Sequence, residues 1–398
     1  MGVAAAVGGI LKAYDVPLAL NAPPFFGRWD LRLSPAALLP VGVGVLAWRV
    51  APALQRLPWR RLLAATYLLG LAWAVSLALT DGLAGLRQPL TGKGEYLSEV
   101  PRIRLDLAGF TGRIVSGSDR WATHVAGHPP GFVLLLKGLD TMGLSGPWPA
   151  AALCVLAGTS AAVAALITVR ALVDERTARL AAPFLALVPA AVWIAVSADA
   201  VYLAVTAWGV TLLALSRRCT PLALAGGALI GTSLFLTYGA LPLGLLVLAV
   251  TARVRGLLVA GLGVAVVVLV FALDGFWWVD GLHQTLIRVH AGAGGSRPYL
   301  YFLLADVAAL AVAVGPATAV GLRALVRGDR LLVLVVPVAL ALLVADLSGT
   351  SRGEVERIWL PFVPWLVVAT ARLQHPRRWL AAQVATGVVV QLGLRSAW

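Results

Sequence analysis

The chain has 398 residues, of which 60% are hydrophobic and 13% are charged, and its 32 Lys and Arg exceed its 18 Asp and Glu to give a net charge of +14. An ordinary soluble domain is about 45–50% apolar and about 25% charged, so this composition excludes a water-soluble globular protein. In a soluble protein the basic excess would suggest nucleic acid. Here the basic residues lie in short connectors between apolar runs, so we expect membrane lipids and no nucleic acid as partners.

The first segment, residues 1–32, is apolar from Met1 to Leu11 but lacks the basic leader and cleavage site of a signal peptide. We expect it to be retained as an extracytoplasmic segment, either interfacial or poorly ordered.

Apolar runs near the ~20-residue length that crosses a bilayer recur from Pro35 to the C-terminus. They predict an all-α transmembrane helical bundle of about twelve spans, forming a single integral membrane domain over residues 1–398. The run after Gly239 is short for a full crossing, so we expect a tilted helix or a half-helix there. The predicted spans cover approximately 36–52, 62–80, 148–170, 179–196, 199–216, 222–238, 240–252, 257–273, 300–324, 331–348, 358–373 and 379–396.

Arginines gather in alternate connectors between these runs. The positive-inside rule assigns such connectors to the cytoplasm, which places both termini and the remaining connectors outside. The basic connectors hold Arg56, Arg60, Arg61, Arg170, Arg176, Arg179, Arg217, Arg218, Arg253, Arg255, Arg323, Arg327, Arg330, Arg372, Arg377 and Arg378.

The predicted outer face carries most of the residues able to do chemistry. It consists of a long first loop over 81–147, a second loop over 274–299 and a charge-dense third loop over 348–358. Loops held by a rigid scaffold commonly carry function, so we expect a site on this outer, extracytoplasmic face of the cell membrane. Four of the five histidines lie there, namely His124, His128, His283 and His290.

The stretch His128-Pro129-Pro130-Gly131 predicts the start of a helix, because proline suits a first helical turn and the apolar run GFVLLLKGL follows. The helix, near 130–142, is too short to cross, so we expect it to lie on or dip into the outer leaflet. His128 would then lie at a helix N-terminus, which favours anions such as phosphate. The alternative is an ordinary loop-to-helix boundary with His128 facing water.

Two aspartates lie at predicted outer ends of spans. Asp81 ends a span, where a carboxylate opposes the helix macrodipole, and this favours a functional role over the alternative of an ordinary boundary residue. Asp199 lies in VSADAVYLAVTAW between two apolar runs, where Ser197 or Asp199 would serve equally as a helix N-cap.

The third outer loop places Arg352, Glu354, Glu356 and Arg357 just before an apolar run. A guanidinium at the depth of Arg357 binds phosphate through paired donors, so this residue is a candidate for a lipid phosphate. A snorkelling or salt-bridged interfacial arginine is the alternative.

Together these positions resemble the glycosyltransferase C superfamily, in particular its protein-mannosyltransferase-like and aminoarabinose-transferase-like branch. The chain departs from that pattern in having Gly127-His128 before Pro-Pro and an additional span before the one that ends at Asp81. The stretches that carry the resemblance are Asp81-Gly82, Gly94 to Leu97, His128 to Gly131, Ser197 to Ala200 and Glu356 to Pro361.

The resemblance implies an enzyme that transfers a sugar from a polyprenyl-phosphate carrier to a glycan, lipid or protein acceptor at the outer face, usually with inversion. It implies Asp81 as the catalytic base, Asp199 as a second acid at the acceptor or metal site, and His128 and Arg357 at the donor phosphate. Some members use a divalent metal, and oxygen ligands would suit Mg or Mn, but the sequence has no compact ligand motif and we assign no cofactor. Further candidate substrate-binding residues are Glu95, His124, Arg352 and Glu356.

Two other classes stay open. Asp306 and Asp346 within apolar runs, together with the short run after Gly239, suit a secondary transporter or lipid flippase, although we find no convincing internal repeat. An inactive scaffold that binds lipid-linked glycans is the third reading.

Overall fold

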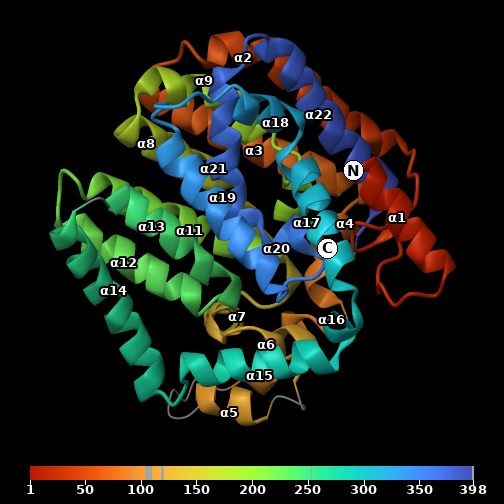
Figure 1. Ribbon diagram of the computed structural model, residues 1–398, viewed down its shortest axis with the longest axis vertical. Helices are drawn as coiled ribbons and strands as arrows, with labels where there is room; N and C mark the ends of the chain where they lie inside the picture. The colour runs from red at the N-terminus through yellow and green to blue at the C-terminus, as the bar shows by residue number, and fades with distance from the viewer. Residues whose placement is uncertain (93, 104–109, 118–120, 252, 397–398) are drawn as a thin grey trace.

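The computed structural model describes residues 1–92, 94–103, 110–117, 121–251 and 253–396 (Figure 1). Almost all regular structure in these ranges is helical, as the composition predicts. The described strands are β1 (Arg28–Trp29) and β2 (Leu394–Arg395), which pair antiparallel and so join the two ends of the chain.

Five helical stretches are long and apolar enough to cross a membrane, and this supports a membrane protein. A sixth crossing results if α17 (Tyr299–Val314) and α18 (Pro316–Arg323) are taken as one span, although they bend by 99°. Gly315, with φ +79°, and Pro316 account for that break. The five are α2 (Leu38–Leu54) with the turn before it, α3 (Trp59–Ala78) with the turn after it, α8 (Pro147–Leu172), α11 (Ala198–Leu215) and α14 (Val254–Leu273).

The expected number of about twelve spans is not confirmed, because the other apolar runs form shorter or interrupted helices. The run expected at 179–196 ends its helix at Ala186 and resumes after Pro189. These shorter elements are α9 (Glu175–Ala186), α10 (Ala191–Ile194), α12 (Pro221–Leu234), η7 (Tyr238–Leu243), α13 (Gly244–Thr251), α19 (Leu332–Ser348), η8 (Leu360–Phe362), α21 (Val363–Val367), η9 (Val368–Arg372) and α22 (Pro376–Gly393).

Several arginine-rich connectors meet at one end of the molecule. The Arg179 guanidinium donates to the carbonyl of Gln55 at 3.0 Å, and that of Arg330 donates to the carbonyl of Leu172 at 2.8 Å. Connectors far apart in sequence are therefore tied together, which agrees with their expected placement on one side of a membrane. Which side of the membrane they face stays a prediction.

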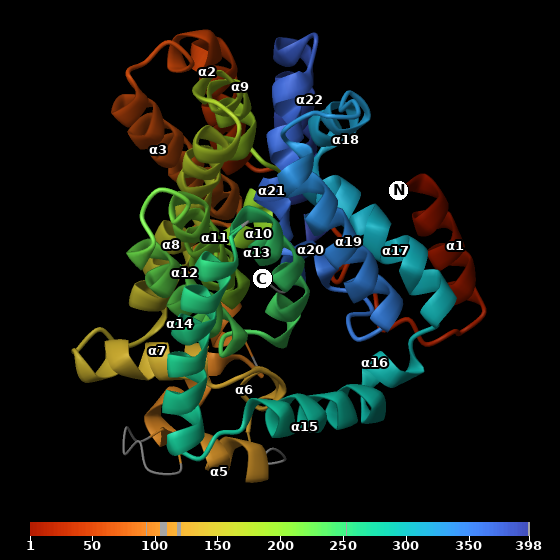
Figure 2. The same ribbon diagram turned by 60° about the vertical axis from the view of Figure 1, so that its left-hand side comes forward.

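The opposite end holds most helices of the expected first and second outer loops (Figure 2). The N–H of Gly131, at the start of α7, donates to the carbonyl of Phe235 at 2.8 Å, which docks the short helix onto the bundle. The expected second and third loops also contain helices. The loop helices are α4 (Ala84–Arg87), α5 (Phe110–Ser116), α6 (Thr123–Gly127), α7 (Gly131–Thr141), α15 (Trp278–Ala291), α16 (Ala293–Ser296) and α20 (Val355–Ile358).

The N-terminal segment is more structured than expected. Helix α1 (Gly2–Ala13) packs against α17, where the Tyr301 hydroxyl donates to the carbonyl of Ala4 at 3.2 Å. Residues 14–33, the N-terminal strap, then lead through β1 to the beginning of α2. The strap thereby reaches the C-terminal ends of α3 and α22, where a candidate site lies.

Candidate functional site

The first cluster surrounds Asp81, in the 3-10 turn η2 (Leu79–Asp81) that ends α3. Gly82 follows with φ +64°, a left-handed conformation that suits glycine and turns the chain into the first loop. Asp81 Oδ2 pairs with the Arg32 guanidinium and lies 3.4 Å from Gln391 Nε2. Arg32 comes from the strap and Gln391 from α22, so three distant segments meet at one carboxylate.

This cluster lines a cavity of about 290 Å³, which we call the Asp81 cavity. Its volume is near the lower end of the about 300–1,000 Å³ typical of small-molecule sites. The Asp81 side chain is 33% exposed, so a ligand in the cavity can reach the carboxylate. The polar side chains along the wall are those of Arg32, Asp81, Gln88, Gln391, Arg395 and Ser396.

The second cluster is centred on Arg357 in α20, and we call it the Arg357 cluster. The guanidinium pairs with Asp199 Oδ2 at 2.7 Å and with Glu354 Oε2 at 2.9 Å. The Arg357 and Asp199 side chains are only 7% and 3% exposed. Glu354 has φ +63°, a strained conformation for a residue with a side chain, and such strain often marks functional sites.

The capping alternative for Asp199 does not describe its contacts. Ser197 occupies the N-cap position of α11 without a side-chain cap hydrogen bond, and its hydroxyl donates instead to the carbonyl of Trp193 at 2.8 Å. Asp199 lies in the first turn and its carboxylate faces Arg357. Its principal partner is thus a charge from α20, about 160 residues along the chain.

Two histidines and two tyrosines adjoin the Arg357 cluster. His124 Nε2 lies 3.2 Å from Glu95 Oε1, and the hydroxyls of Tyr96 and Tyr202 lie 3.0 Å apart. The Tyr96 ring centroid lies 5.8 Å from that of His124 and 6.2 Å from that of His128. The first loop therefore supplies a compact wall of aromatic and hydrogen-bonding groups against α11.

Burial, aided by the neighbouring His124, lowers the pKa of His128 to about 4. His128 is therefore neutral at pH 7. Its Nδ1 lies 3.2 Å from the carbonyl of His124, so Nδ1 carries the proton and Nε2 is an acceptor. An acceptor nitrogen suits a hydroxyl group better than the phosphate expected from the sequence.

The two clusters are adjacent but separate. A small pocket of about 10 Å³ is lined by Glu95, Tyr96, His124 and Arg357, and it shares the wall residue Pro89 with the Asp81 cavity. A volume of 10 Å³ is about the minimum for one water molecule, so this pocket must widen to admit a substrate. Within the described chain, no hydrogen bond or ion pair joins Asp81 to the Arg357 cluster.

Two predicted binding residues, Arg352 and Glu356, belong to neither cluster and line neither cavity. Arg352 donates to the carbonyl of Arg297 at 3.0 Å and lies over the Tyr299 ring, 5.3 Å from its centroid. Glu356 is fully buried, and its Oε1 accepts the N–H of Phe26 at 3.1 Å. Burial raises the pKa of Glu356 to about 7. These contacts tie the strap and the third loop to the bundle.

The sequence interpretation missed three residues at the clusters. Arg32 lies in a segment expected to be interfacial or poorly ordered, and its partner Asp81 is 49 positions away. Gln391 is one of two amides within the apolar run of α22, a signal that could have been noticed. Tyr202 follows Asp199 at a spacing of three on one helix, which places both on the same face.

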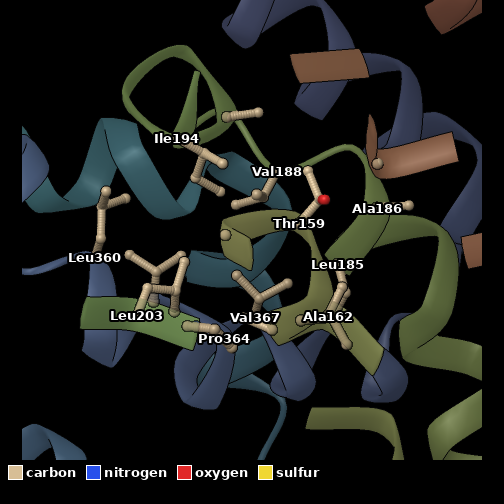
Figure 3. A pocket seen from close by; sticks show the side chains of 15 residues that line it. Thr159, Ala162, Leu185, Ala186, Val188, Ile194, Leu203, Leu360, Pro364 and Val367 are labelled. Atoms are coloured by element: carbon tan, nitrogen blue, oxygen red, sulfur yellow. The ribbon is translucent and has the colours of Figure 1, made fainter. Parts of the chain in front are cut away.

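A separate apolar cavity among α3, α8 and α11 is too small for a prenyl chain. Its volume is about 30 Å³, room for only two or three water molecules at about 10–15 Å³ each. Thr159 and Leu360 line it among aliphatic neighbours, and the Thr159 hydroxyl donates to the carbonyl of Val155 in its own helix (Figure 3).

The donor set does not fit a divalent metal. The described residues contain no group of three or more His, Cys, Asp or Glu side chains able to hold an ion together. A cation at the buried Asp199 would have to displace the arginine that this carboxylate already binds. We therefore assign no step of the chemistry to Mg or Mn.

No family model and no curated protein matches this sequence. Among solved structures, the chain is similar to the crystal structure of the Archaeoglobus fulgidus oligosaccharyltransferase in complex with Zn and sulfate, with 14% sequence identity and a TM-score of 0.49. The match covers 83% of this chain and 53% of the archaeal chain, so this protein corresponds to about half of that one. A similarity at this TM-score does not indicate function. A proposal about function must therefore be based on the geometry of the two clusters.

Proposed function

We propose that this protein is a membrane glycosyltransferase that moves a sugar from a polyprenyl-phosphate-linked donor to an acceptor hydroxyl at the outer face of the membrane, with inversion. The main support for this proposal is the environment of Asp81. Its carboxylate is partly exposed in a polar cavity, and that cavity adjoins a cluster with a buried arginine.

In the proposed reaction, the acceptor oxygen bonds to the anomeric carbon while the bond from that carbon to the phosphate oxygen breaks. The phosphate leaves with the bonding electrons, and the hydroxyl proton passes to Asp81. A positioned base typically contributes about 10²–10⁴-fold in rate. Because acceptor and leaving group lie on opposite faces of the sugar, one displacement inverts the anomeric centre.

The donor phosphate is assigned to Arg357. Of its two carboxylate partners, Glu354 is the more exposed at 22%, against 3% for Asp199. A phosphate can therefore replace Glu354 on one arm of the guanidinium while Asp199 keeps the other, and paired donors suit phosphate geometry. His124, His128 and Glu95 would then face hydroxyl groups of the donor sugar.

The acceptor is assigned to the Asp81 cavity. Its wall offers guanidinium and amide donors beside carboxylate and amide oxygens, a lining that suits several hydroxyl groups at once. We therefore favour a glycan, or a lipid that carries one, over an apolar peptide segment.

The competing transporter reading relies on two acidic residues in apolar helices. Asp306 Oδ1 accepts the N–H of Gly353 at 3.0 Å and so holds the third loop in place. Asp346 Oδ1 is buried and lacks a hydrogen-bond partner among the described residues, which favours an ion-coupled role for that residue. We keep transport as the second candidate on that observation.

The test is sugar transfer by the purified protein in lipid nanodiscs, with a radiolabelled polyprenyl-phosphate sugar and a panel of glycan acceptors. We expect a labelled glycoside whose anomeric configuration, read by NMR, is opposite to that of the donor. In parallel, the protein in liposomes is assayed for movement of labelled donor across the bilayer. Movement without any glycoside would replace the proposal with the transporter.

A further inference from the structure

The N-terminal strap brings a positive charge to the candidate base, in an arrangement the sequence did not predict. Arg32 pairs with Asp81 Oδ2. Gln391 Nε2 lies 3.4 Å from the same oxygen and donates at 2.9 Å to the hydroxyl of Thr80, the residue before Asp81. Among the described residues the other oxygen, Oδ1, has no hydrogen-bond partner. One carboxylate oxygen is therefore held, and the other is available to a ligand in the cavity.

Arg32 is itself fixed at both its side chain and its backbone. Its guanidinium donates to the carbonyl of Leu394 at 2.7 Å and also to that of Gln391. Its backbone N–H donates to the carbonyl of Leu392 at 2.8 Å. The side chain is only 15% exposed. These contacts fix Arg32 in one position beside Asp81. Arg32 is therefore a structural component of the site and not a loosely held residue that only blocks it.

The strap around Arg32 continues this attachment to the end of α22. Trp29 pairs with Leu394, and the N–H of Asp30 donates to the carbonyl of Gly393 at 2.9 Å. At Gly27 a side chain would lie 2.5 Å from the carbonyl oxygen of Arg395, so only glycine allows this close approach. The strap is thus seated by backbone contacts, which hold the guanidinium against the carboxylate.

From these contacts we propose that Arg32 and Gln391 are positioning residues for Asp81, and that the N-terminal strap is a structural part of the acceptor site. Together they clamp Oδ2 and direct Oδ1 toward the acceptor hydroxyl. The inference deepens the proposed function and rests on it for the role of Asp81 as base. Whether Arg32 and Gln391 hold Asp81 Oδ2 in place can be tested without measuring sugar transfer.

The test compares Arg32→Ala with Arg28→Ala in the full-length protein in nanodiscs. Arg28 is a matched control because it lies in the same strap, is exposed and pairs only with Asp30 among the residues described, at 3.2 Å. Misplacing a catalytic group by about 1 Å costs roughly 10²-fold, so we expect Arg32→Ala to lower kcat by about that factor with an unchanged KM for the donor. Arg28→Ala should keep wild-type kcat.

Rescue by added guanidinium ion distinguishes a positioning role of Arg32 from a purely structural one, because a purely structural defect would not be rescued. Added at millimolar concentration, guanidinium should restore part of the kcat of Arg32→Ala, because it fits the space that the side chain leaves. It should not restore an Asp81→Asn variant. Full activity in Arg32→Ala, or a loss that guanidinium does not rescue, would overturn the inference while leaving the glycosyltransferase proposal intact.

A second measurement covers the case in which wild type transfers no sugar. Carbodiimide coupling of glycinamide to Asp81, followed by mass spectrometry, reports how freely that carboxylate reacts. We expect coupling several-fold faster in Arg32→Ala than in wild type or Arg28→Ala, and slowed again by guanidinium. Equal coupling rates in all three proteins would show that Arg32 does not hold Asp81, whatever the protein's activity.

Discussion

The Asp81 cavity and the Arg357 cluster each contain a carboxylate paired with an arginine, but the two pairs differ in their exposure to solvent. Asp81 is 33% exposed beside about 290 Å³ of space, whereas Asp199 is 3% exposed beside a pocket of about 10 Å³. In the first, one oxygen stays accessible. In the second, both partners are removed from water. An accessible carboxylate can exchange a proton with a ligand, and a buried ion pair mainly fixes the structure around it until a ligand opens it.

Breaking the buried pair should give the largest loss of stability. Removing one partner of such a pair leaves an uncompensated charge and costs roughly 3–5 kcal/mol. We expect Arg357→Ala to lower the midpoint of thermal unfolding strongly in nanodiscs. Arg32→Ala, which breaks a more exposed pair, should lower it much less. Similar midpoints for the two variants would remove the distinction between the clusters.

The tyrosine pair next to Arg357 should give an intermediate effect. The hydroxyls of Tyr96 and Tyr202 are buried and lie 3.0 Å apart, so losing one leaves the other unsatisfied at a cost of about 1–3 kcal/mol. We expect Tyr96→Phe and Tyr202→Phe to destabilise singly, and the double variant to cost less than their sum. Additive losses in thermal unfolding would mean that the two hydroxyls are not coupled.

The smallest effect concerns pH and His128. Its pKa is about 4 in the folded protein and about 6.5 when exposed, so the folded state binds the proton less readily. The stability it contributes is present above pH 6.5 and is lost as the pH falls toward 4. Between pH 7.5 and 5.5 this loss amounts to about 1 kcal/mol. Thermal unfolding of His128→Gln should lack that part of the pH dependence, and an unchanged slope would contradict the burial of His128.

The sequence predicted the helical membrane class, and the helix α7 that follows Pro129-Pro130 occupies the expected range, because both depend on local composition. It did not predict the clamp on Asp81. Gln391 and Asp81 are 310 positions apart, and nothing in either apolar run indicates that the two pack together. The count of about twelve spans is not confirmed for a related reason. A hydropathy run does not reveal that Gly315 and Pro316 bend a helix pair by 99°.

Arg352 shows a further limit of reading residue types alone. An arginine in an outer loop suits phosphate, but this one is occupied by the Arg297 carbonyl and the Tyr299 ring. Arg352 and Arg357 carry the same charge and lie in the same loop. Only their neighbours in the fold distinguish a residue that lines a pocket from one that holds a loop.

The most direct test of the roles proposed for the two clusters is the turnover number of Asp81→Asn with labelled polyprenyl-phosphate sugar in nanodiscs, measured together with donor binding. Asp280→Asn is a matched control, since Asp280 is exposed in α15 and lies outside both clusters. We predict that Asp81→Asn loses about 10²–10⁴-fold in turnover while donor affinity and the control stay at wild-type values. Wild-type turnover in Asp81→Asn would contradict the assignment of Asp81 as the base.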